Sequence, residues 1–120
     1  MANRNRTAGH NWEREVIKDL KKVGFKDAVS ARYESKRLDD AGVDIVNTAP
    51  FNMQCKNEAK RPDYHKLITE MPDGINIVLH KYTGKKGTKF HTQGKYVIMD
   101  YESWLELIEL FVTTNTKINR

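Results

Sequence analysis

Two short runs of strand-forming residues, separated by a tight turn, constrain the fold of this 120-residue chain more than any other feature. The run at 43–46 is apolar except for Asp44, and the turn at 47–50 contains a proline. The run at 51–56 alternates as a half-buried strand does, because successive side chains of a strand point to opposite faces. We therefore predict an antiparallel hairpin, whose second strand carries Phe51, Met53 and Cys55 on one face and Asn52, Gln54 and Lys56 on the other.

The remaining elements follow from the spacing of apolar residues. Trp12, Val16 and Leu20 recur at helical intervals, and Gly24 is typical of the position just after a helix. Asp100 is suited to cap the start of the final helix. Such patterns predict helices at 11–23, 62–71 and 101–111, strands at 25–31, 42–46, 51–56, 75–81 and 95–99, a polar loop at 32–42, a flexible basic arm at 1–10 and a polar tail at 113–120. The order predicts a single α/β domain over residues 1–120, with a mixed central β-sheet flanked by helices.

The charge of the chain narrows the class of partner. Lysine and arginine number 21 against 16 aspartate and glutamate, and the resulting net charge of +5 favours a polyanionic partner such as nucleic acid. A single cysteine excludes an intramolecular disulfide, and we expect a cytoplasmic location. The apolar runs are too short to span a membrane, so we expect no membrane association.

Asp44 is the first candidate for chemistry, because a carboxylate in an apolar strand is costly unless it is paired or binds a cation. Gln54 and Lys56 are two residues apart, so they share the strand face that a short hairpin brings beside Asp44. Mg²⁺ prefers oxygen ligands, and we predict that Asp44, Gln54 and the backbone carbonyl of Cys55 bind it, with Mn²⁺ as a substitute. Lys56 would hold or deprotonate an attacking water and offset phosphate charge. The alternative is a structural Asp44 that accepts backbone N–H groups and pairs with Lys56.

Two acids of the first helix are further candidates. At about 100° per residue, Glu13 falls on the apolar face of the helix, whereas Glu15 shares a face with Lys18 and Lys22 and is expected to point to solvent. An acid on the apolar face predicts that Glu13 contributes to the metal site, directly or through a water. The alternative is an acid at the edge of the apolar stripe that pairs with a lysine.

These residues resemble the PD-(D/E)XK nuclease superfamily, and most closely the archaeal-type Holliday junction resolvases with their phage-encoded relatives. The resemblance covers about residues 9–56: Glu13-Arg14-Glu15 opens a helix, Gly24-Phe25 closes it, and Val43-Asp44-Ile45-Val46 and Gln54-Cys55-Lys56 follow. It implies a restriction-endonuclease-like fold and a Mg²⁺-dependent endonuclease of DNA recombination. In that family, Glu13 matches the helix acid, Asp44 the strand acid and Lys56 the lysine.

The resemblance also carries expectations about the substrate and the assembly. A serine near the scissile phosphate is implied, with Ser35 the nearest match and Ser30 the second. Branched DNA is implied as the substrate, and a homodimer with it, because a four-way junction is cut at two symmetric positions. Exposed leucines of the last helix, Leu105 and Leu110, would serve that dimer.

One departure from the family concerns Gln54, which stands where the family has a glutamate. An amide is a weaker metal ligand than a carboxylate, so two alternatives remain: a general or structure-specific DNA nuclease, and a non-catalytic DNA-binding module of the same fold. Glu58 would compensate if its strand ran on that far, and the loop acids Asp39 and Asp40 are further candidates.

Basic residues supply the expected contacts with DNA phosphates. Residues 81–95 hold five lysines and no acid, with three glycines, and we interpret this segment as a flexible hairpin that straddles phosphates. The predicted DNA contacts are Arg4, Arg6, Arg14, Arg32, Lys36, Arg37, Lys85, Lys86 and Lys89.

Overall fold

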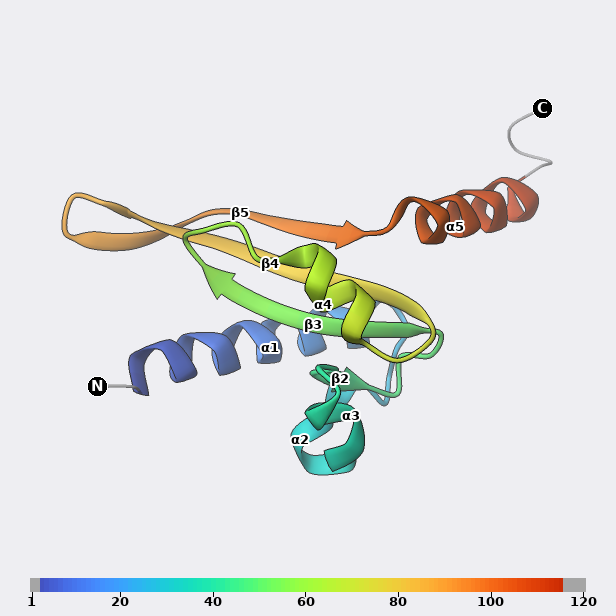
Figure 1. Cartoon of the computed structure of the whole chain (residues 1–120), viewed down its shortest axis with the longest axis horizontal. Coiled ribbons are helices and arrows are strands. Elements are labelled where there is room, and N and C mark those ends of the chain that lie inside the picture. Colours follow the sequence, from blue (N-terminus) through green and yellow to red (C-terminus); the bar gives the residue numbers. More distant parts are fainter. Residues whose placement is uncertain (1–2, 116–120) are drawn as a thin grey trace.

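A computed structural model describes residues 3–115 of the chain, with side chains from residue 7 onward. Its elements in chain order are α1 (Asn3–Val23), β1 (Val29–Ser30), α2 (Ala31–Glu34), α3 (Lys36–Asp40), β2 (Ile45–Val46), β3 (Phe51–Glu58), α4 (Tyr64–Glu70), β4 (Ile75–Lys86), β5 (Lys89–Met99) and α5 (Tyr101–Thr114). Figure 1 shows their arrangement.

The described strands form one mixed sheet in the order β1-β2-β3-β4-β5. Neighbouring strands are antiparallel except for β3 and β4, which run parallel. Ile45 of β2 lies opposite Met53 of β3, which confirms the predicted antiparallel hairpin. The sheet and the helices around it confirm the mixed α/β architecture.

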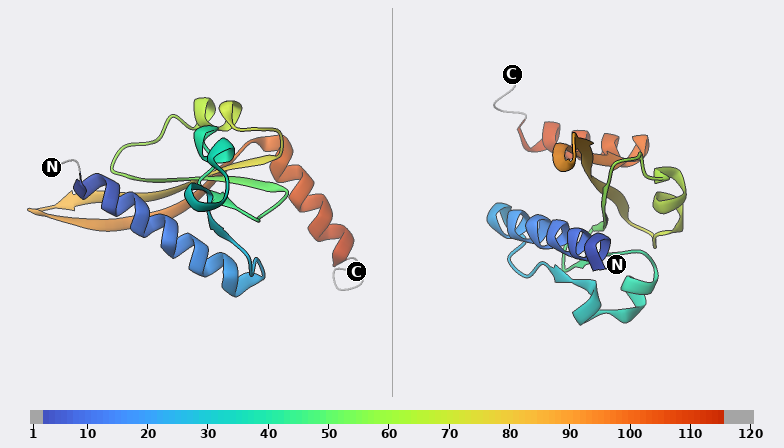
Figure 2. Two further views of the ribbon diagram at one scale, coloured as in Figure 1. Left: turned by 90° about the horizontal axis from the view of Figure 1, so that it is seen from below. Right: turned by 90° about the vertical axis from the view of Figure 1, so that its left-hand side faces the viewer.

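Helices cover both faces of the sheet, as the left view in Figure 2 shows for α1 and α4. On the α1 face, Trp12 and Val16 pack with Ala28 and Ile45, and next to them Met53, Ile75 and Ile77 pack near Leu107 of α5. On the α4 face, a second apolar layer is formed by Ala31, Val43, Val46, Met71 and Val78. The sheet is therefore buried on both faces around β2, β3 and the first half of β4.

The first helix begins at Asn3, so the prediction of a flexible arm at 1–10 is wrong for residues 3–10. The early turns are held against the sheet, because the side-chain amide of Asn57 donates to the carbonyl of Ala8 over 3.3 Å. The helix ends as predicted: Gly24 follows it with φ +130°, a conformation that favours glycine.

The predicted polar loop at 32–42 is wrong, since this segment contains α2 and α3. Each of these short helices begins at a serine that accepts a backbone N–H: Ser30 from Arg32, and Ser35 from Leu38. The strand predicted at 25–31 shortens to β1, because the turn in which Ala28 donates to Phe25 precedes it.

Strands β4 and β5 are longer than predicted, and the segment at 82–94 is mostly a regular hairpin. Pairing extends from Ile77 opposite Met99 to Lys86 opposite Lys89, with an irregularity after Tyr82. Gly87, at φ +70°, forms the turn. In Figure 1 this hairpin projects beyond the rest of the sheet, on the side where α1 begins.

The final helix starts after Asp100, whose carboxylate accepts the N–H of Ser103 over 3.1 Å, as predicted for a capping aspartate. It runs to Thr114, so two residues of the predicted polar tail are helical; 116–120 lie outside the described residues. Within 3–115, no helix is both long and apolar enough to cross a membrane.

Candidate active site

Asp44 lies at the start of β2, where its backbone and side chain both bond to neighbouring segments. Its N–H donates to the carbonyl of Met53, and its carbonyl accepts the N–H of Ala31, each over 2.8 Å. Its side-chain Oδ2 accepts the N–H of Cys55 over 2.7 Å. The other carboxylate oxygen, Oδ1, has no hydrogen-bond donor in the described part of the chain, so it is available to a ligand.

Alternation along β3 places Gln54 and Lys56 on one face of the sheet, and Asp44 lies at the edge of this strand. Ile45 pairs with Met53, and the N–H of Asp44 also donates to the carbonyl of Met53, so the regular pairing of β2 with β3 stops at Ile45. The amide of Gln54 turns toward Gly42, where a Cβ atom would lie 3.5 Å from its Oε1. Gly42 has φ +90°, so a larger residue there would be strained. Asp44 meets strand β3 at the N–H of Cys55, the residue between Gln54 and Lys56, and the charge of Lys56 acts on its pKa. The convergence of all three side chains on one face stays a prediction.

Cys55 points to the opposite face, as predicted, and packs beside Trp12, Val16 and Ile45. Burial raises the pKa of its thiol above the ordinary value, and the charges of Asp44 and Glu13 add to that rise. The thiol is therefore a poor nucleophile at neutral pH. Its N–H points toward Asp44, and both backbone groups of a residue in an extended strand lie on the same edge, so its carbonyl faces that edge too.

The carboxyl group of Asp44 has an unusual acidity. Burial raises its pKa from 3.8 to about 6, and the negative charge of Glu13 acts in the same direction. The hydrogen bond from Cys55 and the positive charge of Lys56 oppose this rise. The charges of Glu13 and Lys56 thus both act on the pKa of Asp44, and a bound cation would lower that pKa again.

Glu13 points into the core, as its position on the helix predicts, and is only 6% exposed. It pairs with Arg32 of α2, whose Nη1 lies 3.1 Å from Oε1 and 3.2 Å from Oε2. The partner is an arginine from a distant segment and not the lysine that the alternative supposed. The guanidinium of Arg32 thus neutralises Glu13, and the predicted contact of Arg32 with DNA stays a prediction.

The prediction that Glu15 points to solvent is wrong. Its carboxylate lies between α1 and the hairpin, where Lys81 donates to Oε1 over 3.0 Å and Lys95 pairs with Oε2. The pKa of Glu15 is lowered mainly by its bond to Lys95. Both ammonium groups also lie over the ring of Trp12, at 5.5 and 5.8 Å from its centroid. Lys81 and Lys95 therefore hold α1 to the sheet.

The remaining candidate acids lie on β3 and α3, and the two serines stand at the starts of α2 and α3. Strand β3 does reach Glu58, but four residues separate it from Gln54, which is about 13 Å along a strand, too far to replace it beside Asp44. Asp40 pairs with Lys36 on the surface, and the charge of Asp39 contributes to the raised pKa of Asp44. Ser35 and Ser30 cap helices, so the hydroxyl of Ser35 is occupied by a backbone N–H.

The predicted DNA contacts fall into three groups. Lys85, Lys86 and Lys89 are exposed at the end of the β4–β5 hairpin, as predicted. Arg14 is exposed on α1 and donates to Asn11 over 2.7 Å, while Lys36 and Arg37 are exposed on α3. The side chains of Arg4 and Arg6 lie outside the described ones.

The donor set beside Asp44 fits a hard divalent cation in its chemistry, since it offers carboxylate, amide and carbonyl oxygens. It offers few charges: Arg32 occupies Glu13, and Gln54 is neutral. Among residues 3–115, no group of three or more histidine, cysteine, aspartate or glutamate side chains is placed to hold a metal. A cation here would rest on Asp44 as its one uncompensated carboxylate, with the oxygens of Gln54 and Cys55.

Comparisons of the chain with protein-family models, curated proteins and solved structures give no match. The interpretation of this site therefore rests on its own residues and their geometry.

Proposed function

We propose that this protein is a Mg²⁺-dependent endonuclease that hydrolyses phosphodiester bonds of DNA, and that its substrate is branched DNA of the Holliday junction type. The observation that carries the proposal is the contact of the buried Asp44 carboxylate with strand β3 at Cys55, between Gln54 and Lys56, with one carboxylate oxygen of Asp44 not engaged. The net charge of +5 and the exposed lysines of the hairpin support a polyanionic substrate.

Each residue around Asp44 has a separate role in the proposed hydrolysis. A divalent cation held by Asp44, Gln54 and the Cys55 carbonyl would polarise the phosphate and acidify a water. The Cys55 N–H fixes the orientation of the Asp44 carboxylate. Lys56, whose charge acts on Asp44, offsets the charge that grows on the phosphoryl oxygens and positions the attacking water. Arg32 compensates the charge of Glu13 beside the site.

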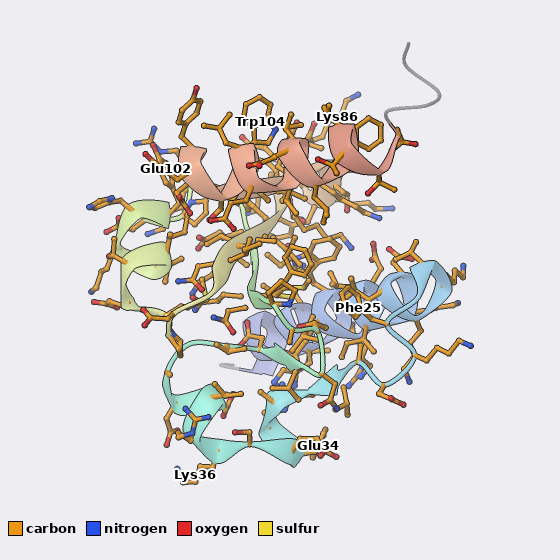
Figure 3. The ribbon with its side chains drawn as sticks, turned by 90° about the vertical axis from the view of Figure 1, so that its right-hand side faces the viewer. Phe25, Glu34, Lys36, Lys86, Glu102 and Trp104 are labelled. Carbon is orange, nitrogen blue, oxygen red and sulfur yellow. The ribbon has the colours of Figure 1, made fainter. Side chains whose placement is uncertain are left out.

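A homodimer is part of the proposal, because symmetric cutting of a four-way junction needs two sites related by a two-fold axis. Helix α5 is the surface that we assign to it. Trp104 lies on the side of α5 that faces away from the sheet (Figure 3), and exposed apolar side chains continue along the helix. They are Tyr101, Trp104, Leu105, Ile108, Leu110 and Phe111, each between 38% and 65% exposed.

A second candidate is a DNA-binding module of the same fold that does not cut. The pairing of Glu13 with Arg32 and the neutral Gln54 favour it, because they leave one uncompensated carboxylate at the site. A general DNA nuclease differs from a resolvase only in substrate. The three functions are separable in one set of reactions.

The test is cleavage of a labelled four-way junction, a linear duplex and a flap of matched sequence, with Mg²⁺ or Mn²⁺ and with chelator. We expect metal-dependent, paired cuts in the junction and slower cutting of the duplex. Asp44→Asn should reduce cleavage by at least about 100-fold, since it removes the charged ligand. The matched control is Asp40→Asn, which makes the same change at the exposed pair with Lys36.

Each other result has a definite meaning. Equal cutting of junction and duplex would reject the resolvase and keep the nuclease. Binding of DNA without cleavage of any form, unaffected by Asp44→Asn, would establish the non-catalytic module instead.

A further inference from the structure

Three residues on adjacent strands form a row across the sheet that begins at Lys56. Lys56 of β3 pairs with His80 of β4, and His80 pairs with Tyr96 of β5. Residues directly opposite each other in a ladder point to the same face, so Tyr96 lies on the face of Lys56. Two strand spacings separate them, about 10 Å, which is close to three stacked nucleotides at 3.4 Å each.

The row ends in an exposed aromatic ring. His80 is buried, at 5% exposure, with its Nε2 3.0 Å from the carbonyl of Glu58, whereas Tyr96 is 56% exposed at the edge strand. The next row toward the hairpin holds Tyr82, 38% exposed, opposite Gly94. Two aromatic rings thus stand on this face beyond the proposed active site.

The absence of a side chain at Gly94 leaves room for the ring of Tyr96. A Cβ atom at Gly94 would lie 2.5 Å from the hydroxyl of Tyr96 and 2.7 Å from two of its ring carbons. The ring therefore lies across the backbone of Gly94, in space that any larger residue would fill, and one side of the ring is left to solvent. Such a flat, supported ring is suited to stacking with another planar group.

Helix α4 does not extend over these rings. Its Leu67 and Ile68 pack in the layer around Val78, which belongs to the row before His80. The charges along this part of the sheet are mainly positive. Lys56 lies opposite His80 and Glu58 opposite Tyr82, and the hairpin continues with Lys85, Lys86 and Lys89. The pocket beside Glu58 is lined by Lys60, Arg61 and Asp63. An exposed aromatic pair in a basic surface fits a nucleic acid strand better than an apolar protein segment.

We propose that Tyr96, with Tyr82 beside it, is a stacking platform for unpaired bases of DNA, close to the phosphate that Lys56 receives. The proposal rests on the proposed nuclease function and narrows its substrate class to DNA whose bases are unstacked near the cleavage point. A base paired within a continuous duplex does not present its face to such a ring, whereas a base at a branch or in a single strand does.

The test is equilibrium binding, measured by fluorescence anisotropy with chelator present so that no cleavage occurs. The probes are a labelled single-stranded oligonucleotide, the duplex of the same sequence, and an RNA of the same sequence. Tyr96→Ala should weaken single-strand binding about 5- to 100-fold, the size of one lost base stack, and change duplex binding less than about two-fold. Tyr96→Phe keeps the ring and should bind like the wild type.

Tyr33→Ala is the matched control, because it removes an exposed tyrosine from α2, away from the β4–β5 rows. Equal losses for single strand and duplex on Tyr96→Ala, or no loss for either, would overturn the platform. Tighter binding of the RNA would overturn DNA as its ligand. A second measurement uses the wild-type chain: ultraviolet cross-linking of a 5-iodouracil oligonucleotide should label the peptides that contain Tyr82 or Tyr96. Labelling confined to other peptides would contradict the proposal.

These outcomes are separable from those of the nuclease test. If no DNA form is cut but Tyr96→Ala still weakens single-strand binding, the platform stands and the catalytic proposal fails. If the junction is cut and Tyr96→Ala binds and cuts like the wild type, only the platform fails.

Discussion

Arg32 of α2 pairs with the buried carboxylate of Glu13 of α1, and its Nη1 lies 3.1 Å from Oε1 of Glu13. The two side chains meet because α2 begins after Ser30, where the N–H of Ala31 donates to the carbonyl of Asp44. This pair decides the charge beside the proposed metal site. Without the guanidinium, Glu13 and Asp44 would be two neighbouring carboxylates in a poorly solvated place.

Removal of that guanidinium should therefore destabilise the protein. Arg32→Gln leaves Glu13 buried without its cation, and we expect a loss of about 2 kcal/mol in the free energy of unfolding. Urea denaturation at pH 7 measures it. The double variant with Glu13→Gln should recover most of the loss, because the uncompensated charge is gone. The exposed Lys36, changed to Gln, should have no measurable effect; an equal loss there would contradict this account.

Asp44 should cost stability in the metal-free protein. Its pKa is about 6 in the folded protein against an ordinary 3.8, because the folded state disfavours the ionised carboxylate. The resulting loss in the free energy of unfolding is complete above pH 6 and disappears below pH 3.8. Asp44→Asn should thus stabilise the metal-free protein at pH 7 by about 2 to 3 kcal/mol, with a smaller gain at pH 4. Urea denaturation in chelator checks this, with Asp40→Asn as control. A loss of stability at pH 7 would show that the carboxylate is structural.

A negative charge at position 54 should strengthen metal binding and lower the stability of the metal-free protein. Gln54→Glu adds a second carboxylate beside Asp44, and it should tighten Mn²⁺ binding at least about 10-fold while lowering metal-free stability. Titration followed by electron paramagnetic resonance measures the affinity. Gln93→Glu makes the same change at an exposed position of β5 and should leave it unchanged. Mn²⁺ affinity unaltered by Gln54→Glu would remove Gln54 from the site.

Helix α5 should associate with a second copy of the chain. Leu105→Glu combined with Leu110→Glu places charges on its exposed apolar surface and should convert dimer to monomer in sedimentation velocity experiments. Glu109→Gln is the control on the same helix and should leave the dimer intact. A wild-type chain that stays monomeric at high concentration would reject this interface.

The sequence predicted the parts of the fold that depend on local pattern. Alternation at 51–56 predicted strand β3 and the face of Cys55, and the capping Asp100 predicted the start of α5. The hairpin arrangement followed from two adjacent strands and a short turn. These features need only neighbouring residues, so they are readable from a single chain.

Features that depend on tertiary contact were missed. Glu15 was expected in solvent because only its helix neighbours were visible, whereas its partners, Lys81 and Lys95, come from strands more than sixty residues away. The pairing of Arg32 with Glu13 was missed for the same reason. The row that joins Lys56 to Tyr96 depends on the parallel register of β3 and β4, which the sequence pattern does not determine.

Anomalous diffraction from crystals soaked in Mn²⁺ tests the proposed metal site itself. We expect an anomalous peak within bonding distance of Oδ1 of Asp44 and Oε1 of Gln54, and its loss in Asp44→Asn crystals. Peaks only elsewhere on the molecule, or no peak at saturating Mn²⁺, would contradict a metal-dependent site at Asp44.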